Sequence, residues 1–290
     1  MRTLTITADD FGFSPSVNEA VLRAAEFGTL NAASLMTNMP FAEEAAAATK
    51  QRMPHLNLGL HFTLTSGIPI APKEEVHLLV DDNGHFRYGF GGLVRLLYGK
   101  NNVEIKQQIR REFTAQLSEI DRLTKEYDLR FDRLDSHQHI HVLPGIFDIL
   151  YEEANRRGWT LRIPRERFGS SRRFFCRFLS WGAAGLLKRE ILKYFLPPIA
   201  GPDYFGILDT GKMDTAAWNE IVAVLTGSAV EVNIHPSLEP GADEAVWRCS
   251  EGDRMFHRSI WRRKEFDTIV NEEFRRWHCC CPHNCMSLNT

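Results

Sequence analysis

Short apolar segments with strand character alternate with amphipathic segments of helical periodicity along most of this chain. Such alternation predicts a mainly parallel sheet with helices packed outside it. The expected strands cover residues 3–8, 31–37, 56–64, 130–135, 160–163, 206–208 and 229–234. Ser14 and Pro15 are expected to open the first helix as N-cap and first helical residue. Further helices are expected up to about residue 50 and over 103–127, 145–157, 215–225 and 259–276.

The side chains best suited to chemistry fall at the carboxyl ends of these expected strands: Asp9, Asp10, His61, Asp135, His137 and His235. Active sites of α/β barrels assemble at that end of the strands, and open doubly wound sheets obey a similar rule. Four separate strand ends must converge on one site, which a closed sheet achieves readily. We therefore predict an α/β fold, an irregular, TIM-barrel-like (β/α) barrel with mainly parallel strands and helices outside.

The length of 290 residues and the hydrophobic content of 43% suit a single large domain. We expect this domain to cover residues 1–276, with insertions at about 67–102 and 165–203, and an unstructured Cys-rich tail at 277–290. The tail combines cysteines and histidines in a way that suggests zinc, but its spacing matches no common zinc module. An unstructured reactive tail explains the same residues at least as well.

Charge and hydropathy limit the partners of this chain. A formal net charge of −2 argues against general nucleic-acid binding, and no apolar run reaches the length of a membrane span. The N-terminus has no signal-peptide pattern, so we expect a cytoplasmic location. Residues 165–193 carry eight Lys or Arg against two Glu, interleaved with aromatic residues. They suit peripheral contact with the anionic inner face of a membrane, although a surface hairpin with solvated bases is slightly favoured. A homodimer is left open.

The segment from Thr5 to Gly12 ends an apolar strand with two adjacent carboxylates, Asp9 and Asp10. Buried carboxylates are costly unless a cation or a proton compensates them. One of the two is expected to bind a cation while its neighbour takes a proton from bound water. Taken alone, an Asx-type turn that caps the next helix explains the pair better.

Histidines supply the complementary ligands. Histidine occupies every second position at His137, His139 and His141, so the three rings would share one face of an extended segment. Such a cluster indicates a metal-binding site. Asp135 is expected to orient a ligand histidine, and His139 or His141 to face the substrate. His61 and His235 could each be core residues when taken alone, but His235 also suits a general acid.

Arg162 and Arg165 follow another expected strand. Either guanidinium could bind an anionic or hydroxyl-rich substrate. Surface salt bridges are the first-ranked explanation for both.

Several motifs resemble the YdjC-like carbohydrate deacetylases, and the resemblance runs from about Thr3 to about Phe274. The motifs that carry it are Thr7–Ser14, Ser34–Asn38, Gly59–Leu64, Leu134–His141 and the pair His235-Pro236. The chain looks closest to the deacetylase associated with hopanoid biosynthesis, judging by Leu161–Arg165 and the basic stretch after it, and is also similar to the chitooligosaccharide deacetylases. After Phe274 it departs from the family pattern.

The resemblance implies an irregular α/β barrel that holds one divalent metal ion through Asp10, His61 and His137. It assigns Asp9 as general base and His235 as general acid or oxyanion stabiliser. The donor atoms suit Zn, Co or Mn, and the family adds Mg. The implied reaction removes the acetyl group from an N-acetylated amino sugar, such as N-acetylglucosamine in an oligosaccharide or a glycolipid head group. Alternatives are a metal-dependent phosphoesterase or other hydrolase on the same barrel, and a non-catalytic carbohydrate- or lipid-binding protein with a structural metal.

Overall fold

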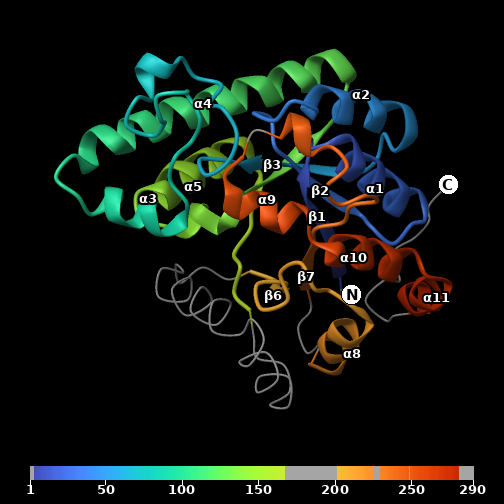
Figure 1. Cartoon of the computed structure of the whole chain (residues 1–290). Helices are drawn as coiled ribbons and strands as arrows, with labels where there is room; N and C mark the ends of the chain where they lie inside the picture. The colour runs from blue at the N-terminus through green and yellow to red at the C-terminus, as the bar shows by residue number, and fades with distance from the viewer. Residues whose placement is uncertain (1–2, 167–200, 225–228, 248, 281–290) are drawn as a thin grey trace.

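Seven parallel strands form a single curled sheet, a half-barrel with helices around it, in this computed structural model (Figure 1). The structure describes residues 3–166, 201–224, 229–247 and 249–280, so most of the predicted membrane-contact segment 165–193 lies outside the described residues. The sheet order is β5-β4-β3-β2-β1-β7-β6. The strands are β1 (Thr3–Phe11), β2 (Ala32–Leu35), β3 (Asn57–Phe62), β4 (Phe131–Ser136), β5 (Thr160–Leu161), β6 (Asp203–Phe205) and β7 (Ala229–Ile234).

Helices pack around this sheet, with α4 running along the top of the view in Figure 1 and α8 and α11 at the opposite side. The α-helices are α1 (Pro15–Glu26), α2 (Ala42–Arg52), α3 (Phe90–Leu97), α4 (Asn102–Tyr127), α5 (Ile146–Arg157), α8 (Thr215–Val224), α9 (Glu251–His257), α10 (Ile260–Val270) and α11 (Glu272–Cys280). Short 3-10 helices are η1 (Lys73–Glu75), η2 (His137–Val142) and η4 (Glu244–Val246). Among the described helices, none combines the length and the apolar character that a membrane span requires.

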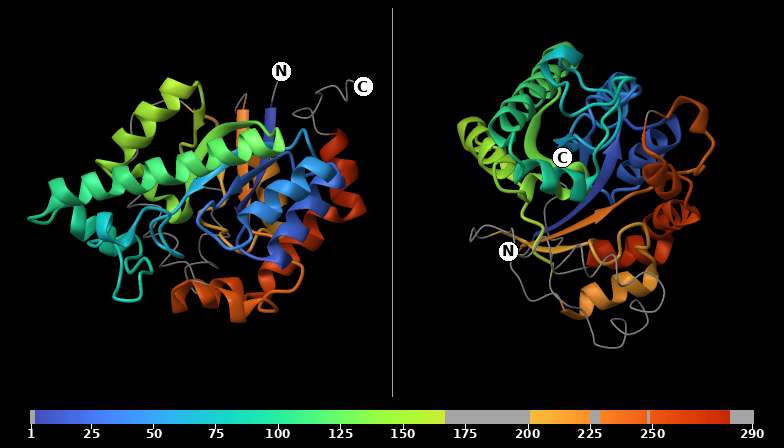
Figure 2. Two further views of the ribbon diagram at one scale, coloured as in Figure 1. Left: turned by 90° about the horizontal axis from the view of Figure 1, so that it is seen from above. Right: turned by 60° about the vertical axis from the view of Figure 1, so that its left-hand side comes forward.

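The two edges of the sheet approach each other. An isolated parallel bridge joins Glu166, which follows β5, to Tyr204 in β6, and the backbone N–H of Tyr204 donates to the carbonyl of Arg165 at 3.4 Å. The central strands β1 and β7 run side by side, as the blue and orange arrows show (Figure 2). The prediction of a barrel-like α/β fold with mainly parallel strands is confirmed.

Strand β1 extends three residues beyond its predicted end and carries both site carboxylates. Its pairing with β2 shifts register between Ala8 and Phe11, and Asp10 adopts a left-handed backbone with φ of 63°. A bulge of this kind re-aims the side chains around it. Ser14 caps α1 as predicted, because its Oγ accepts the backbone N–H of Val17.

Two predicted elements were wrong in their bounds. The strand expected at 206–208 lies at Asp203–Phe205, because the Glu166 carboxylate accepts the backbone N–H groups of Gly206 and Leu208 and so replaces strand pairing there. The helix expected over 259–276 is broken into α10 and α11 at Asn271, whose backbone is extended and whose Oδ1 accepts the N–H of Glu273.

The tail predicted to be unstructured from residue 277 begins inside a helix. Helix α11 continues through Cys280, and residues 281–290 lie outside the described residues. The expected boundary at 276 therefore falls within α11.

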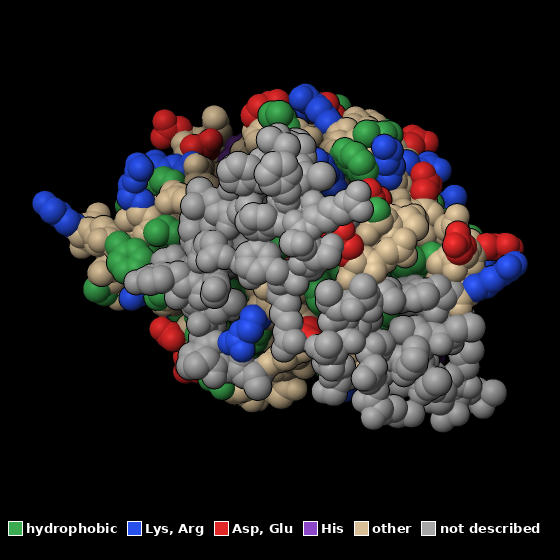
Figure 3. All heavy atoms as spheres, turned by 90° about the horizontal axis from the view of Figure 1, so that it is seen from below, with side chains coloured by type: hydrophobic (Ala, Val, Ile, Leu, Met, Phe, Trp, Pro, Cys, Tyr) green, Lys and Arg blue, Asp and Glu red, His purple; other side chains and the backbone are tan. Residues whose placement is uncertain are grey.

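The insertion at 67–102 is fixed to the barrel through α4. The buried carboxylate of Glu112 accepts the backbone N–H groups of Ile70 and Ala71, and Gln108 accepts that of Leu78. These contacts hold the first part of the insertion against α4, and α3 packs on α4 as well. On the face in Figure 3, acidic and basic side chains are interspersed over the described surface, in keeping with a net charge near zero.

Candidate metal centre

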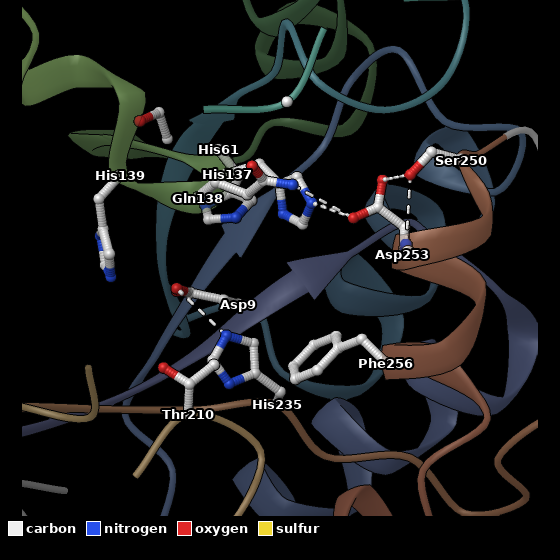
Figure 4. A pocket seen from close by; sticks show the side chains of 13 residues that line it. Asp9, His61, His137, Gln138, His139, Thr210, His235, Ser250, Asp253 and Phe256 are labelled. Carbon is white, nitrogen blue, oxygen red and sulfur yellow. Dashed lines mark hydrogen bonds and ion pairs between the residues drawn. The ribbon is translucent and has the colours of Figure 1, made fainter. Parts of the chain in front are cut away.

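A cavity of about 420 Å³ opens at the carboxyl ends of the strands (Figure 4). Its volume lies in the range typical of small-molecule sites. Most of the lining residues have polar side chains, and the half-buried ring of Phe256 supplies an apolar patch. The lining residues are Asp9, His61, Gly89, Ser136, His137, Gln138, His139, Thr210, His235, Ser250, Gly252, Asp253 and Phe256.

Asp10, His61 and His137 converge beside this cavity, which His61 and His137 line and from which Asp10 is buried. One ligand atom from each lies within 4.8 Å of the other two, and all three residues are buried. The Oδ1 atom of Asp10 is 3.2 Å from Nδ1 of His137 and 3.7 Å from Nε2 of His61. The structure thus brings together the three residues predicted as metal ligands, from β1, β3 and the start of η2.

The donor atoms fit a divalent ion. Asp10 Oδ1 is buried, yet it makes no hydrogen bond within the described part of the chain. Its near neighbours are the imidazole nitrogens of His137 and His61, so a cation at this point would supply the charged partner that this buried oxygen lacks when both rings are neutral. Two imidazole nitrogens and one carboxylate oxygen form a common metal-binding set that leaves positions open for water or substrate.

Asp135 orients His61, as predicted for a residue that supports a ligand. The two are register partners in adjacent strands, and Asp135 Oδ1 lies 2.6 Å from Nδ1 of His61. An N–H donated from Nδ1 leaves the lone pair of Nε2 for a metal ion. Burial alone would raise the pKa of Asp135, but the charge of Arg162 and the hydrogen bonds with His61 and Ser34 hold it well below its ordinary value. Asp135 therefore stays ionised and keeps His61 in this orientation.

His137 lies between two carboxylates. Burial would lower its pKa, but Asp10 on one side and Asp253 on the other together raise it to about 10. Asp253 Oδ1 is 3.5 Å from Nε2 of His137 (Figure 4). A position that attracts a proton this strongly attracts a metal cation for the same electrostatic reason.

Metal binding is expected to release a proton from His137. Its pKa of about 10 leaves the ring charged near pH 7 without an ion, and a metal ion must displace that proton. The apparent metal affinity should therefore rise about tenfold per pH unit up to about pH 10. Titration calorimetry in buffers of different ionisation enthalpy measures the protons released. A value near zero at pH 7.5 would contradict this picture.

Asp9 has different partners from its neighbour Asp10. Its two carboxylate oxygens lie 2.9 Å from the two terminal nitrogens of Arg162, and Asn233 donates to Oδ2 at 3.1 Å. Asp10 Oδ2 instead accepts from Arg262 at 2.8 Å. The two adjacent carboxylates thus have separate partners. This is the arrangement that we expect when Asp10 is a metal ligand and Asp9 a base.

His235 stands next to Asp9 at the end of β7, with its Nε2 3.9 Å from Asp9 Oδ2 (Figure 4). Its backbone N–H donates to the buried carboxylate of Glu265, which fixes the start of the following loop. Burial lowers the pKa of His235 to about 4. The imidazole is therefore neutral near pH 7.

The prediction that three histidines share one face of an extended segment was wrong. Residues 137–142 form a turn in which Gln138 and His139 both have left-handed backbones, with φ of 56° and 57°. This turn sends the three rings to different places. His137 joins the ligand set and His139 lines the cavity. His141 is fully buried and lies 2.6 Å from Ser136 Oγ and 3.0 Å from the carbonyl of Arg162, so it is not placed to meet a substrate.

Arg162 is neither a surface residue nor part of the cavity wall. It is 2% exposed, and its guanidinium is paired with the carboxylates of Asp9, Asp135 and Glu231. A surface salt bridge was therefore the wrong explanation. The prediction that Arg162 binds substrate directly does not fit this position either, because all three guanidinium nitrogens already contact carboxylates.

Sequence reasoning missed Arg262 and Asp253, which contact the ligands. Arg262 in α10 is completely buried against Asp10, and Asp253 in α9 faces His137. Neither has a sequence signal, because Arg262 stands in the basic run Arg262–Lys264 and Asp253 in an ordinary polar helix start. Gln138 was also missed, and it links Asp253 to the backbone N–H of Phe90.

The buried charges around the ligands do not balance. Five carboxylates face three guanidinium groups in this network: Asp9, Asp10, Asp135, Glu231 and Asp253 against Arg133, Arg162 and Arg262. Once the ligand histidines are neutral, as metal binding requires, this leaves an excess of two negative charges. A divalent cation bound at the ligand set would neutralise that excess.

Comparisons with known proteins agree with these features. Residues 3–279 match the family described as YdjC-like protein. A carbohydrate deacetylase of Mus musculus is 34% identical over 297 residues, covering 94% of this chain and 90% of that protein. A carbohydrate deacetylase of Geobacillus stearothermophilus is 36% identical over 155 residues, and the match spans 53% of this chain and only 57% of that relative.

A solved structure shows the same fold. The crystal structure of a putative cellobiose-phosphate cleavage protein from Enterococcus faecalis aligns with a TM-score of 0.63 and 20% identity, covering 95% of this chain and 93% of that chain. Together with the family match over nearly the whole length, the comparisons lead to one conclusion: the chain belongs to the YdjC-like protein family.

Proposed function

We propose that this protein is a metal-dependent hydrolase that removes the acetyl group from an N-acetylated amino sugar. The observation that carries the proposal is the cluster of Asp10, His61 and His137 at a cavity that Asp9 also lines. The relatives named carbohydrate deacetylase and chitooligosaccharide deacetylase support the amide bond of such a sugar as the target.

One divalent ion is proposed at Asp10, His61 and His137, with Zn or Mg as the first choices and Co or Mn as further ones. Such an ion supplies Lewis-acid chemistry, polarising the acetyl carbonyl and lowering the pKa of water. Two further residues hold the ligands in place: Asp135 orients His61, and Arg262 donates a hydrogen bond to the second oxygen of Asp10.

Asp9 is proposed as the proton acceptor for the attacking water. Its carboxylate lines the cavity and is held in place by Arg162 and Asn233. His235, neutral because burial lowers its pKa to about 4, is placed 3.9 Å away to take up that proton and pass it to the departing amine. Water and amide thus give acetic acid and the amine, and near pH 7 the acid's proton moves to the amine, so that acetate and an ammonium group are the products.

The substrate is proposed to be N-acetylglucosamine in an oligosaccharide or glycolipid head group. Polar groups such as Asp253, Gln138 and Thr210 can meet sugar hydroxyls, while the Phe256 ring offers an apolar surface for a sugar face. A lipid-linked substrate, peripheral contact with the inner face of a membrane, the hopanoid-related subfamily and a homodimer stay predictions, as does the cytoplasmic location.

Acetate release tests the function directly. Metal-stripped protein is expected to release acetate from N-acetylglucosamine oligosaccharides only after a divalent ion is added back. Soluble and lipid-linked substrates assayed in parallel separate the two substrate classes. A protein that binds one ion but hydrolyses phosphate esters instead would be the phosphoesterase alternative. One that binds an ion and turns over none of these substrates would fit a structural metal.

A further inference from the structure

The guanidinium of Arg162 is shared between two carboxylates that serve different parts of the site. One terminal nitrogen lies 2.9 Å from Asp9 Oδ2. The other lies 2.9 Å from Asp9 Oδ1 and 2.9 Å from Asp135 Oδ2. A planar, always charged fork can hold two carboxylates at a fixed separation, which a point charge on a flexible stem cannot do.

These two carboxylates belong to different tasks. Asp135 contacts Nδ1 of His61 at 2.6 Å and so sets the direction of a ligand ring. Asp9 lines the cavity and is the proposed proton acceptor. Asn233 also holds Asp9 and Ser34 also holds Asp135, but among the described residues only Arg162 contacts both carboxylates. The position of the base relative to the metal ligands therefore depends on Arg162.

Asp9, His61 and Asp135 also form a second set whose ligand atoms lie within 4.8 Å of one another. Without Arg162 this set would suit a second metal ion. The 2.9 Å contacts of Arg162 with both carboxylates place a permanent cation there instead. The centre is thereby restricted to a single ion at Asp10, His61 and His137.

We propose that Arg162 is a positioning residue that takes the place of a second cation, holding the base Asp9 and the ligand-orienting Asp135 in a fixed relation. The inference rests on the proposed function, since it assigns Asp9 and His61 the roles given above. Its consequence is that one substitution at Arg162 disturbs metal affinity and turnover together, through two separate carboxylates.

The test compares Arg162→Lys with Arg133→Lys. Arg133 is a matched control because it is also a buried arginine of this network, but its hydrogen bonds go to Glu231 at 2.6 Å and to Thr7 at 3.3 Å. Both variants keep a positive charge and lose a planar fork. Comparable losses of thermal stability are expected from both, so stability alone does not separate them.

For Arg162→Lys, we expect Co²⁺ affinity in calorimetry to fall about 10- to 100-fold, the size seen when support for a ligand is lost. The kcat for acetate release should fall about 100-fold with KM nearly unchanged. Arg133→Lys should stay within about threefold of the wild type in Co²⁺ affinity and kcat. Wild-type protein should bind one Co²⁺ per chain.

Equal losses of Co²⁺ affinity in the two variants, or a wild-type affinity in Arg162→Lys, would overturn the proposal. So would a stoichiometry of two ions per wild-type chain when the tail cysteines are alkylated, because a second ion at Asp9, His61 and Asp135 would have to displace Arg162. The Co²⁺ titrations need no substrate, and their result therefore stands even where the wild-type protein releases no acetate. Failure of this inference is in that way distinguishable from failure of the proposed deacetylase activity.

Discussion

Replacing Asp10 by Asn is expected to abolish metal binding and turnover together. The substitution removes the only carboxylate of the proposed ligand set while keeping its shape. Asn tolerates the left-handed backbone that Asp10 adopts, with φ of 63°, so the bulge in β1 should persist. Metal affinity should fall by more than about 100-fold, and acetate release should drop to background. Metal analysis of the purified variant and a calorimetric titration measure the first effect.

The same substitution also leaves Arg262 without its charged partner. Both side chains are completely buried, and removing one member of a buried ion pair costs about 3–5 kcal/mol. A thermal melt of Asp10→Asn should therefore show a lower Tm, and activity must be assayed below it.

Asp128→Asn provides the matched control for Asp10→Asn. Asp128 also has a left-handed backbone, with φ of 49°, but it ends α4 at the opposite end of the strands, where its exposed carboxylate pairs with Lys50. This variant should bind metal and release acetate as the wild type does. A folded Asp10→Asn protein with wild-type metal affinity would remove Asp10 from the ligand set.

The strand ends could be predicted from the sequence because parallel strands that alternate with helices all present their carboxyl ends to one side. Given that geometry, charged or imidazole side chains just after Ala8, Leu60, Leu134 and Ile234 had to converge. The register pairing of His61 with Asp135 follows from the same arrangement. Their convergence could therefore be predicted from the residues, whereas the choice of Asp10, His61 and His137 as the ligands came from the resemblance to the YdjC-like deacetylases.

The contact between Arg262 and Asp10 could not be predicted from the sequence. Arg262 is completely buried only because α10 packs over the end of β1, and a basic run in an amphipathic helix normally faces solvent. The sequence gives no sign of the left-handed turn at Gln138 and His139 either, because neither residue is glycine. Such strain persists only where the surrounding structure imposes it. Here it separates His137 from His141.

Asp9→Asn is expected to keep the metal ion and lose turnover. The ligand set does not include Asp9, so metal affinity should stay within about threefold of the wild type. An amide cannot accept the proton of the attacking water, and loss of a general base lowers kcat about 100- to 10,000-fold. KM should change little, because the cavity wall keeps its shape. The combination of full metal content and lost kcat distinguishes a base from a ligand.

The control for Asp9→Asn is Asp121→Asn. Asp121 also receives two parallel hydrogen bonds from one arginine, Arg157, at 2.5 and 2.8 Å, but its side chain is 55% exposed on α4. Exposed ion pairs contribute little to stability, so this variant should match the wild type in every assay. Asp9→Asn additionally places an amide N–H₂ against the Arg162 guanidinium, which should lower its Tm. Wild-type kcat in Asp9→Asn would assign the proton transfer to another group, and loss of its metal would place Asp9 among the ligands.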